Sequence, residues 1–431
     1  MKVRRILAIY MMGSYGDIHP FIVLGKELHR IGWQPTFFSN ETFRDIVEAE
    51  GFSFVSITDK DLYEKTYKSP NVWTNKGLLA HTCRYHFPAL LPTFNKLNSF
   101  HKKNPIDLII GTNIFSGASW LAEKLKIPYV RVSLNPFSDK DVLVSELSWL
   151  KNPKKFIVKS VWFIAKHISI FKFDRKMIKP IINPIRKELG LSKISFKEII
   201  TKITETSSLA MYPRWYISPK ETRSNIKFTG FPCTDPIDNN ARTTLDNILK
   251  QVTEKPIAFA PGSAVYDVED YLLKAQYACE QVKRTGIFVT RSMSECKRIS
   301  PNMIVMNYVD FSYLFSKCEL VCHHGGIGTT AQCIKAGVPQ IIRPLAYDQP
   351  DNGRRIKNLG LGEVVNKNCN QFELSLIIKK IIDTRSYNLA AKALAGNVSP
   401  NAAATESVRA INEFYLSEKY IKSISISREL E

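Results

Sequence analysis

Apolar residues in this chain follow two alternating patterns. Runs of about four to eight apolar residues, typical of buried strands, alternate with stretches in which apolar residues recur every three or four positions, as on one face of a helix. Near the start, the apolar run 5–12 precedes Phe21, Leu24 and Leu28, which would share one helical face. Further strands are predicted at residues 34–39, 52–57, 107–111, 129–133, 209–212, 256–260, 287–290, 303–308, 320–322, 338–342 and 363–365. Repeated strand–helix units predict an α/β fold with doubly wound parallel sheets.

Length and polarity divide the chain into two domains. With 431 residues it is too long for one ordinary hydrophobic core and fits two domains of roughly 200 residues each. A polar run at 234–244 marks the best boundary. We therefore predict four segments: a first domain at 1–233, a linker at 234–255, a second domain at 256–400, and a C-terminal segment at 401–431 made of a long helix and a frayed tail.

The composition narrows the class of protein. With 44% hydrophobic and 23% charged residues, it is typical of a globular protein, and no run of 18 apolar residues predicts a membrane span. The eight cysteines form no C-x-x-C pair, so we expect them to be reduced, in a cytosolic setting. The formal net charge of +20 predicts anionic partners. No zinc finger, RNA-binding aromatic signature or basic repeat supports nucleic acid as that partner.

One glycine-rich stretch has the form of an anion-binding site. The apolar run 320–322 ends at His323-His324-Gly325-Gly326-Ile327-Gly328, and a helical pattern follows from Thr329. A glycine turn that opens a helix points several backbone N–H groups and the positive end of the helix dipole at one position, which suits a phosphate or diphosphate. A tight strand-to-helix turn without a ligand would contain the same glycines, so both interpretations stay open at this point.

Polar residues beyond the next strand favour the anion site. Asp348 and Gln349, with Asn352 three residues on, follow the predicted strand 338–342. Loops beyond successive strand ends of a parallel sheet converge on one crevice. A carboxylate and an amide beside an anion would suit the hydroxyl groups of a sugar.

Together these motifs resemble a known family. The pattern H-x-G-G-x-G-T, followed by G-V-P-Q and D-Q-x-x-N, is similar to the donor-binding signature of the two-domain GT-B glycosyltransferases of the family-1 and family-28 type. The resemblance is narrowest to the antibiotic and macrolide glycosyltransferases, the sterol glucosyltransferases and the rhamnolipid rhamnosyltransferase. It extends from Ile6 to about Phe414, and it implies two Rossmann-like domains facing a cleft, with the last helix crossing back to the first domain.

The resemblance also implies roles for residues of the second domain. The donor diphosphate is expected at Ser263, His323, Gly325, Gly326, Gly328 and Thr329, the nucleotide base at Tyr308 and Val309, and the donor sugar at Asp348 and Gln349. His323, rather than His324, falls on the H-x-G position, so the His323 side chain is expected to contact the diphosphate. No metal ion is implied, and no cofactor beyond the nucleotide-sugar co-substrate.

In the first domain, the motif G-S-Y-G-D-I-H-P from Gly13 to Pro20 matches the family pattern G-x-x-G-[D/H]-x-x-P. The family carries its general base at the fifth position, so Asp17 is expected to remove the acceptor's proton. A helix predicted to start near Ile18 gives Asp17 a second interpretation, as the N-cap of that helix. His19 stands two residues after the base position and is interpreted as a helix-entry residue.

Residues 151–187 form a strongly basic segment with eleven Lys or Arg and one Asp. Such an amphipathic segment is predicted either to contact an anionic membrane or to pack on the first domain with a solvated lysine face. The resemblance places part of the acceptor pocket here, which suits a hydrophobic acceptor. Two D-x-D strings, Asp59–Asp61 and Asp139–Asp141, are interpreted as solvated turns rather than as metal ligands.

These observations predict an inverting hexosyltransferase. It would move a hexose from a UDP- or dTDP-sugar to a hydroxyl of a small hydrophobic or lipid-like acceptor. Two alternatives stay open: a nucleotide-sugar epimerase of the same fold, and a non-catalytic homologue that acts as a partner protein. The expected location is the cytoplasm, with peripheral contact at the inner membrane face left open.

Overall fold

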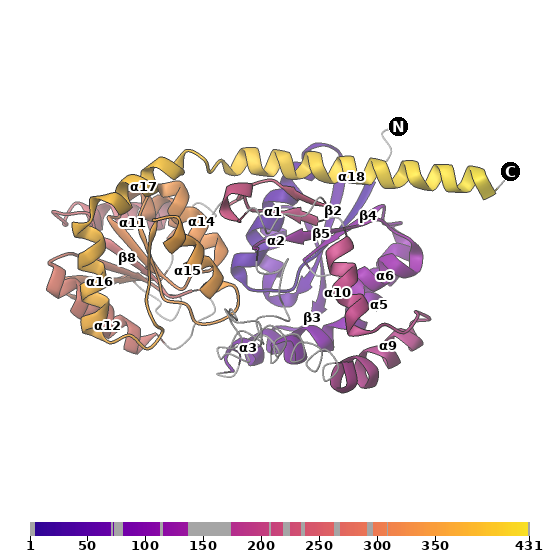
Figure 1. Ribbon diagram of the computed structural model, residues 1–431, viewed down its shortest axis with the longest axis horizontal. Helices are drawn as coiled ribbons and strands as arrows, with labels where there is room; N and C mark the ends of the chain where they lie inside the picture. Colours follow the sequence, from indigo (N-terminus) through magenta and orange to yellow (C-terminus); the bar gives the residue numbers. More distant parts are fainter. Residues whose placement is uncertain are drawn as a thin grey trace, which may run out of the picture.

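The computed structural model describes residues 5–69, 72, 81–112, 115–136, 174–206, 208–218, 225–233, 238–262, 268–290, 296–307 and 309–429, with backbone alone at 200, 203–205 and 419–429. The described residues form two α/β domains that lie side by side, each built around one seven-stranded sheet (Figure 1). The predicted fold class is confirmed. Among the described residues, no helix combines the length and apolarity needed to cross a membrane.

The first sheet is parallel throughout and has the order β3-β2-β1-β4-β5-β6-β7. Its strands are β1 (Arg5–Tyr10), β2 (Trp33–Asn40), β3 (Ser53–Thr58), β4 (Leu108–Gly111), β5 (Tyr129–Ser133), β6 (Ser208–Ala210) and β7 (Ile226–Phe228). Its helices include α1 (Tyr15–Arg30), α2 (Arg44–Ala49), α3 (Lys60–Tyr67), α5 (Phe87–Lys103), α6 (Gly117–Leu125), α9 (Asn183–Glu188) and α10 (Phe196–Glu205), with π-helical segments at Thr82–His86 and Asp174–Ile182. The central strands are buried on both faces, which explains why their sequences are apolar throughout rather than alternating.

The second sheet has the order β10-β11-β9-β8-β12-β13-β14, with β10 antiparallel to β11 and all other pairs parallel. Its strands are β8 (Ile257–Ala260), β9 (Gly286–Val289), β10 (Lys297–Ser300), β11 (Met303–Met306), β12 (Leu320–His323), β13 (Gln340–Ile342) and β14 (Gly362–Val364). Its helices are α11 (Asn239–Leu249), α12 (Glu269–Val282), α13 (Phe311–Lys317), α14 (Ile327–Ala336), α15 (Gln349–Asn358), α16 (Gln371–Asp383) and α17 (Arg385–Ala395).

The last helix, α18 (Pro400–Glu429), leaves the second domain and runs along the first (Figure 1). Ile411 and Tyr415 are part of the first domain's core, and the Tyr415 ring meets Trp33 edge to face with centroids 4.9 Å apart. Near the start of the helix, the Ser407 hydroxyl donates to Thr229 over 2.8 Å. The final helix therefore belongs to the first domain by its contacts, although it follows the second domain in the chain.

Three boundaries differ from those predicted. Helix α1 begins at Tyr15, not near Ile18, because Ser14 takes the N-cap position. Much of the segment predicted as a linker is helix α11, whose Leu245 is buried in the second domain's core. The tail predicted to fray after residue 418 continues as helix α18 to Glu429.

Candidate functional site

The N-termini of two helices from different domains meet at the centre of the molecule. Helix α14 follows β12 directly, and its N-cap is Gly326. A Cβ added to Gly328 would lie 4.0 Å from the carbonyl oxygen of Gly16, in the first turn of α1. The glycine-rich loop of the second domain therefore faces the first-domain loop that carries Asp17. Helix dipoles and free N–H groups from both sides point into this region.

Gly325 allows the loop to turn. Its φ of +91° lies in a region that residues with a side chain rarely adopt, and an added Cβ would come within 2.6 Å of Cγ2 of Ile342 and 3.2 Å of the Gln349 carbonyl oxygen. Glycine is thus required here for backbone conformation and for packing against the neighbouring strand. The turn places the amides of Gly326 and Gly328 at the helix start, as the anion-site interpretation requires.

The buried His323 ring supports the glycine-rich loop. The ring is 0% exposed at the end of β12, and burial lowers its pKa to about 3, so it is neutral at physiological pH. The Gly325 N–H donates to its Nδ1 over 3.1 Å, so Nε2 carries the proton and donates to Oε1 of Gln340 at 2.9 Å. Both nitrogens are used inside the protein. The expected contact between the His323 side chain and the diphosphate stays a prediction; in this structure one ring nitrogen bonds to the Gly325 N–H and the other to Gln340.

His324 lies closer to the open side of the loop. It is half-buried, and its Nδ1 is 3.4 Å from the Ala260 carbonyl oxygen at the end of β8. A Cβ on Gly262 would meet the His324 ring at 3.1 Å, and a Cβ on Gly326 would approach its Nε2 at 2.5 Å. The ring is thus sandwiched between the loop after β8 and the loop after β12. Sequence position alone did not distinguish this placement from that of a surface residue.

Asn352 joins the glycine loop to the acidic residue beyond β13. This side chain is 0% exposed, and its Nδ2 donates to the Gly325 carbonyl and to Asp348 Oδ2, both at 2.8 Å. Its Oδ1 accepts from the Tyr216 hydroxyl at 3.1 Å. The amide therefore fixes the Asp348 carboxylate relative to the anion loop. This explains why an amide stands in the last position of the D-Q-x-x-N pattern.

Gln349 is nearly buried, with 4% of its surface exposed. Its Oε1 accepts from the backbone N–H groups of Leu345 and Ala346, at 2.7 and 3.1 Å. The side-chain oxygen therefore holds the loop that carries Asp348. The amide NH₂ is the part of this residue that would meet a sugar.

Asp17 lies in the first turn of α1, as its third residue. Its Oδ2 accepts from the Ser14 backbone N–H at 2.7 Å and from the Ser14 hydroxyl at 3.0 Å. The carboxylate is therefore not the N-cap, but it does bond back to the N-cap residue, as in a capping box. Burial raises the pKa of Asp17, against the lowering effect of the two Ser14 hydrogen bonds. A raised pKa brings a carboxylate closer to the range useful for a general base.

The two carboxylates influence each other across the domain boundary. Burial, and next the charge of Asp17, raise the pKa of Asp348 to about 7, while the Asn352 hydrogen bond works in the opposite direction. A negative charge makes a second carboxyl group harder to ionise only when the two groups are close together. Asp17 and Asp348, which are separated by 331 positions in the chain, are therefore brought into one site.

Not every residue of the expected site can be placed. Ser263, Tyr308 and the Asp139–Asp141 string lie outside the described residues. Val309 is fully buried in the core of the second domain, and Thr329 is half-buried in the first turn of α14.

Metal ligands do not gather in the described part of the chain. No group of three His, Cys, Asp or Glu side chains there has the arrangement of a metal site. In the first D-x-D string, Asp59 caps α3 by accepting from the Leu62 N–H, and Asp61 forms an exposed pair with Lys65. These two aspartates therefore lie at the start of a helix, where a solvated turn was expected. None of the eight cysteines, all of which lie within the described ranges, forms a disulfide.

An aromatic cluster beside Asp17 was not anticipated from the sequence. Tyr67, His81 and Tyr85 pack together, with ring centroids 5.2 to 5.9 Å apart, and the charge of Asp17 contributes to raising the pKa of both tyrosines. From the second domain, Tyr347 reaches into this cluster: its ring lies 5.7 Å from His81 and its hydroxyl donates to the Val72 carbonyl at 2.9 Å. Tyr347 has a φ of +60°, which is unusual for a residue with a side chain. It precedes Asp348 in the chain, so the residue next to that carboxylate is held by contacts with the first domain.

The arrangement matches known proteins. Residues 284–414 match the C-terminal domain of erythromycin biosynthesis protein CIII-like proteins. A sterol 3-beta-glucosyltransferase of Vanderwaltozyma polyspora is 23% identical to this chain over 97% of its length. The match covers 35% of that relative, so the chain spans about a third of the relative's length. The glycosyltransferase of kitacinnamycin has a similar structure, with a TM-score of 0.69, 15% identity and coverage of 96% of this chain and 99% of that one. The glycosyltransferase VinC in complex with dTDP gives a TM-score of 0.64 at 15% identity, covering 96% of this chain and all of that one.

These likenesses agree with the site's geometry. The structural neighbours establish the fold, and the sequence matches extend through both domains. The chain therefore has the two-domain GT-B fold, and its sequence is similar to those of family-1 glycosyltransferases.

Proposed function

We propose that the protein is an inverting glycosyltransferase that moves a hexose from a UDP- or dTDP-sugar to a hydroxyl of a small hydrophobic or lipid-like acceptor. One observation carries the proposal: the first-domain loop that carries Asp17 faces the α14 anion loop of the second, where a Cβ on Gly328 would lie 4.0 Å from the Gly16 carbonyl oxygen, and the charge of Asp17 contributes to raising the pKa of Asp348. A base and a sugar-binding carboxylate on opposite sides of one cleft suit transfer between two bound substrates. The relatives are named as enzymes acting on sterols, and VinC was solved with dTDP, which supports the choice of acceptor and donor class.

In the proposed reaction, Asp17 accepts the proton of the acceptor hydroxyl. The acceptor oxygen forms a bond to the anomeric carbon as the bond from that carbon to the diphosphate oxygen breaks, which inverts the configuration. The negative charge that develops on the diphosphate is stabilised by the N–H groups of Gly326 and Gly328 and by the α14 dipole. His323 and Asn352 hold that loop, and Asp348 accepts hydrogen bonds from sugar hydroxyls. Ser263, Thr329, Tyr308 and Val309 complete the proposed donor contacts.

The donor is tested by a thermal shift panel of UDP- and dTDP-sugars. A donor that binds the folded chain alone adds about 2.7 kcal/mol of stability at 100 times its Kd, and the Tm rises accordingly. We expect one nucleotide class to give the larger shift. Free hexose and an ADP-sugar are the controls. A panel in which no nucleotide-sugar raises the Tm above these controls would contradict the proposal.

The proposed chemistry needs no metal ion, because backbone amides and a helix dipole carry the charge of the leaving diphosphate. Turnover should therefore be nearly unchanged by EDTA. Transfer rates measured with and without the chelator, and after addition of Mn²⁺, test this. A complete loss in EDTA that Mn²⁺ restores would show that a metal takes part and would direct attention to Asp139–Asp141.

Peripheral membrane contact through residues 151–187 also remains a proposal. Residues 151–173 lie outside the described residues, and 174–187 form a π-helical segment and α9. Vesicles with anionic lipid should bind the chain weakly at low salt, and binding should fall steeply toward physiological salt because the attraction is screened. Co-sedimentation measures this. Binding that is independent of salt, or absent at low salt, would favour a packed segment with a solvated lysine face.

A further inference from the structure

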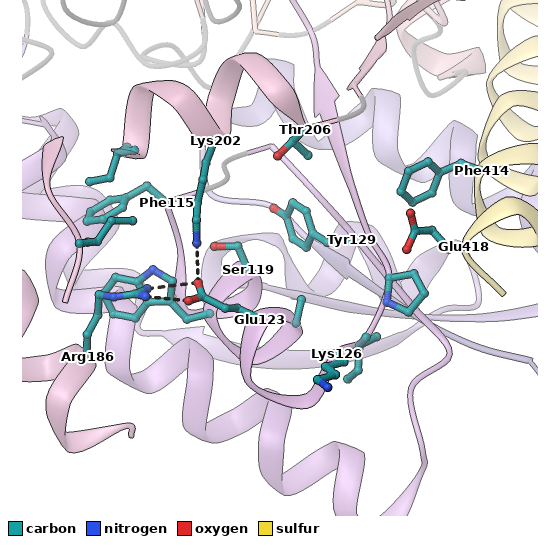
Figure 2. Close-up of a pocket in the computed structure, with 16 residues that line it drawn as sticks. Phe115, Ser119, Glu123, Lys126, Tyr129, Arg186, Lys202, Thr206, Phe414 and Glu418 are labelled. Atoms are coloured by element: carbon teal, nitrogen blue, oxygen red, sulfur yellow. Dashed lines mark hydrogen bonds and ion pairs between the residues drawn. The ribbon is translucent and has the colours of Figure 1, made fainter. Parts of the chain in front are cut away.

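A second pocket lies away from the cleft, on the flank of the first domain (Figure 2). It has a volume of 530 Å³ and lies among α6, α10, the start of β5 and the outer part of α18. Asp17 follows the end of β1, whereas Pro128 and Tyr129 line this pocket at the start of β5. Because the strands are parallel, these two positions lie at opposite ends of the strands. Phe115, which follows β4, is on the Asp17 side, but none of the residues assigned to the transfer site lines this pocket.

The wall of this pocket combines apolar and aromatic side chains with polar ones, among them Lys126 and Glu418. Its apolar lining includes Phe115, Trp120, Ile127, Tyr129, Ile199 and Phe414. Pockets of about 300 to 1,000 Å³ with such walls are typical of small-molecule sites. Phe414 comes from α18, so the helix that crosses from the second domain forms one side of the pocket (Figure 2).

The polar part of the pocket is organised around Glu123. One carboxylate oxygen accepts from Arg186 Nη2 at 2.8 Å and the other from Lys202 Nζ at 3.1 Å (Figure 2). Burial opposes ionisation of Glu123, but these two hydrogen bonds outweigh it and lower its pKa. Arg186, which is buried, also donates from Nε to the Ser192 carbonyl. Two cations around one carboxylate leave this group with a net positive charge.

A smaller hollow of 450 Å³ adjoins the first. The two share Glu123, Arg186, Ile194 and Lys202, so they adjoin at the ion-paired group around Glu123, and we treat them together as one groove. The smaller hollow adds Lys193 and Lys197, which are exposed and have no ion-pair partner among the residues that the structure describes. Its other acidic residue, Glu198, accepts from the Ser195 backbone N–H at the start of α10. The groove thus runs from an aromatic chamber to a basic opening.

We propose that this groove binds an anionic amphiphile. The apolar body would lie against Tyr129 and Phe414, and the phosphate or carboxylate head would lie among Lys193, Lys197 and Lys202. Apolar area removed from water supplies most of the binding energy, and the lysines select for a negative head. This site and the transfer site use different residues, so a test of amphiphile binding does not depend on the proposed reaction.

Isothermal titration of the full chain, below the micelle concentration, tests the proposal with three probes: dodecyl phosphate, dodecanol and inorganic phosphate. Dodecyl phosphate should bind more tightly than dodecanol by about 10-fold or more, and inorganic phosphate should give no measurable heat. Tight binding of inorganic phosphate alone would contradict the proposal that the ligand is an amphiphile, and it would indicate a simple anion site. Equal binding of dodecanol and dodecyl phosphate would overturn the role of the lysines.

Two variants locate the site. The double variant Lys193→Gln with Lys197→Gln should weaken the binding of dodecyl phosphate by about 10-fold, because each exposed charge contributes modestly. The binding of dodecanol should be unchanged. Phe414→Ala should weaken both tailed probes. The matched control is Lys250→Gln with Lys255→Gln, which removes the same charge from the second domain and should change neither. If the control weakens binding as much as the Lys193/Lys197 pair, or if neither the lysine pair nor Phe414→Ala has an effect, the amphiphile binds elsewhere and the proposal fails.

Discussion

Replacing Asp17 with Asn should lower kcat by about 10²- to 10⁴-fold, or roughly 3 to 5 kcal/mol of transition-state stabilisation. The amide oxygen of Asn can still accept from the Ser14 N–H, so the first turn of α1 and the Tm should be preserved. What Asn cannot do is accept the acceptor's proton. Initial rates with saturating donor and acceptor, together with a melting curve, measure the two effects separately.

The control for this variant lies on the same helix. Glu27→Gln also removes one carboxylate from α1, but Glu27 pairs with Arg30 near the other end of the helix, away from the cleft. It should leave kcat unchanged. Donor affinity should be similar in the wild type and in Asp17→Asn, since the donor contacts are proposed for the second domain. If Asp17→Asn retains wild-type kcat, the residue only completes the helix start, and His19 becomes the next candidate base.

Replacing His323 with Ala should damage both the fold and donor binding. The change leaves a cavity at a fully buried position and removes the partners of the Gly325 N–H and of Gln340 Oε1. Such losses cost about 3 kcal/mol or more, which corresponds to a fall in Tm of roughly 6 to 12 °C for a domain of this size. Because the anion loop loses its support, donor KM should rise and kcat should fall, by about 10-fold or more.

His324→Ala is the paired comparison for His323. The His324 ring is half-buried and has one long hydrogen bond, 3.4 Å, to the Ala260 carbonyl, so its removal should change Tm little. Kinetics should be measured well below the Tm of each variant, so that unfolding does not mimic a loss of activity. Equal losses of donor affinity at the two positions would mean that His324, above the loop, contacts the diphosphate directly. A stable His323→Ala protein would contradict the supporting role assigned to that ring.

Much of the fold could be predicted because local patterns determine it. The apolar runs gave most of the strands, since buried parallel strands favour continuous apolar residues. Strand β5 was predicted at its observed bounds although it contains Arg131. Helix α5 was missed: Pro88 stands at its start and Pro92 lies inside it, and both obscure a helical pattern. The helix α11 was mistaken for a linker because its sequence is mostly polar and Leu245 is its one fully buried residue.

The site was predictable where the chain is contiguous. The glycine loop and Asp348 follow neighbouring strands of one parallel sheet, so their proximity was expected from its topology. Asp17 lies in the other domain, and its place at the same cleft was expected from the family resemblance. The hydrogen bonds of His323 could not be predicted, because the bond to Gln340 depends on how β12 and β13 pair. The contact of Tyr347 with His81 and Val72 joins segments more than 260 positions apart, and no local pattern encodes it.

The path of helix α18 constrains how this protein could be recombined with others. A hybrid enzyme with a new donor specificity would be sought by exchanging the second domain. A single junction after residue 233 would also replace α18, and with it Tyr415 and Ile411, which complete the core of the acceptor domain. A foreign helix there would leave Trp33 without its matched partner. The exchangeable unit is therefore an internal segment with two junctions, one before α11 and one near Ser399, so that α18 stays with the domain whose core it completes.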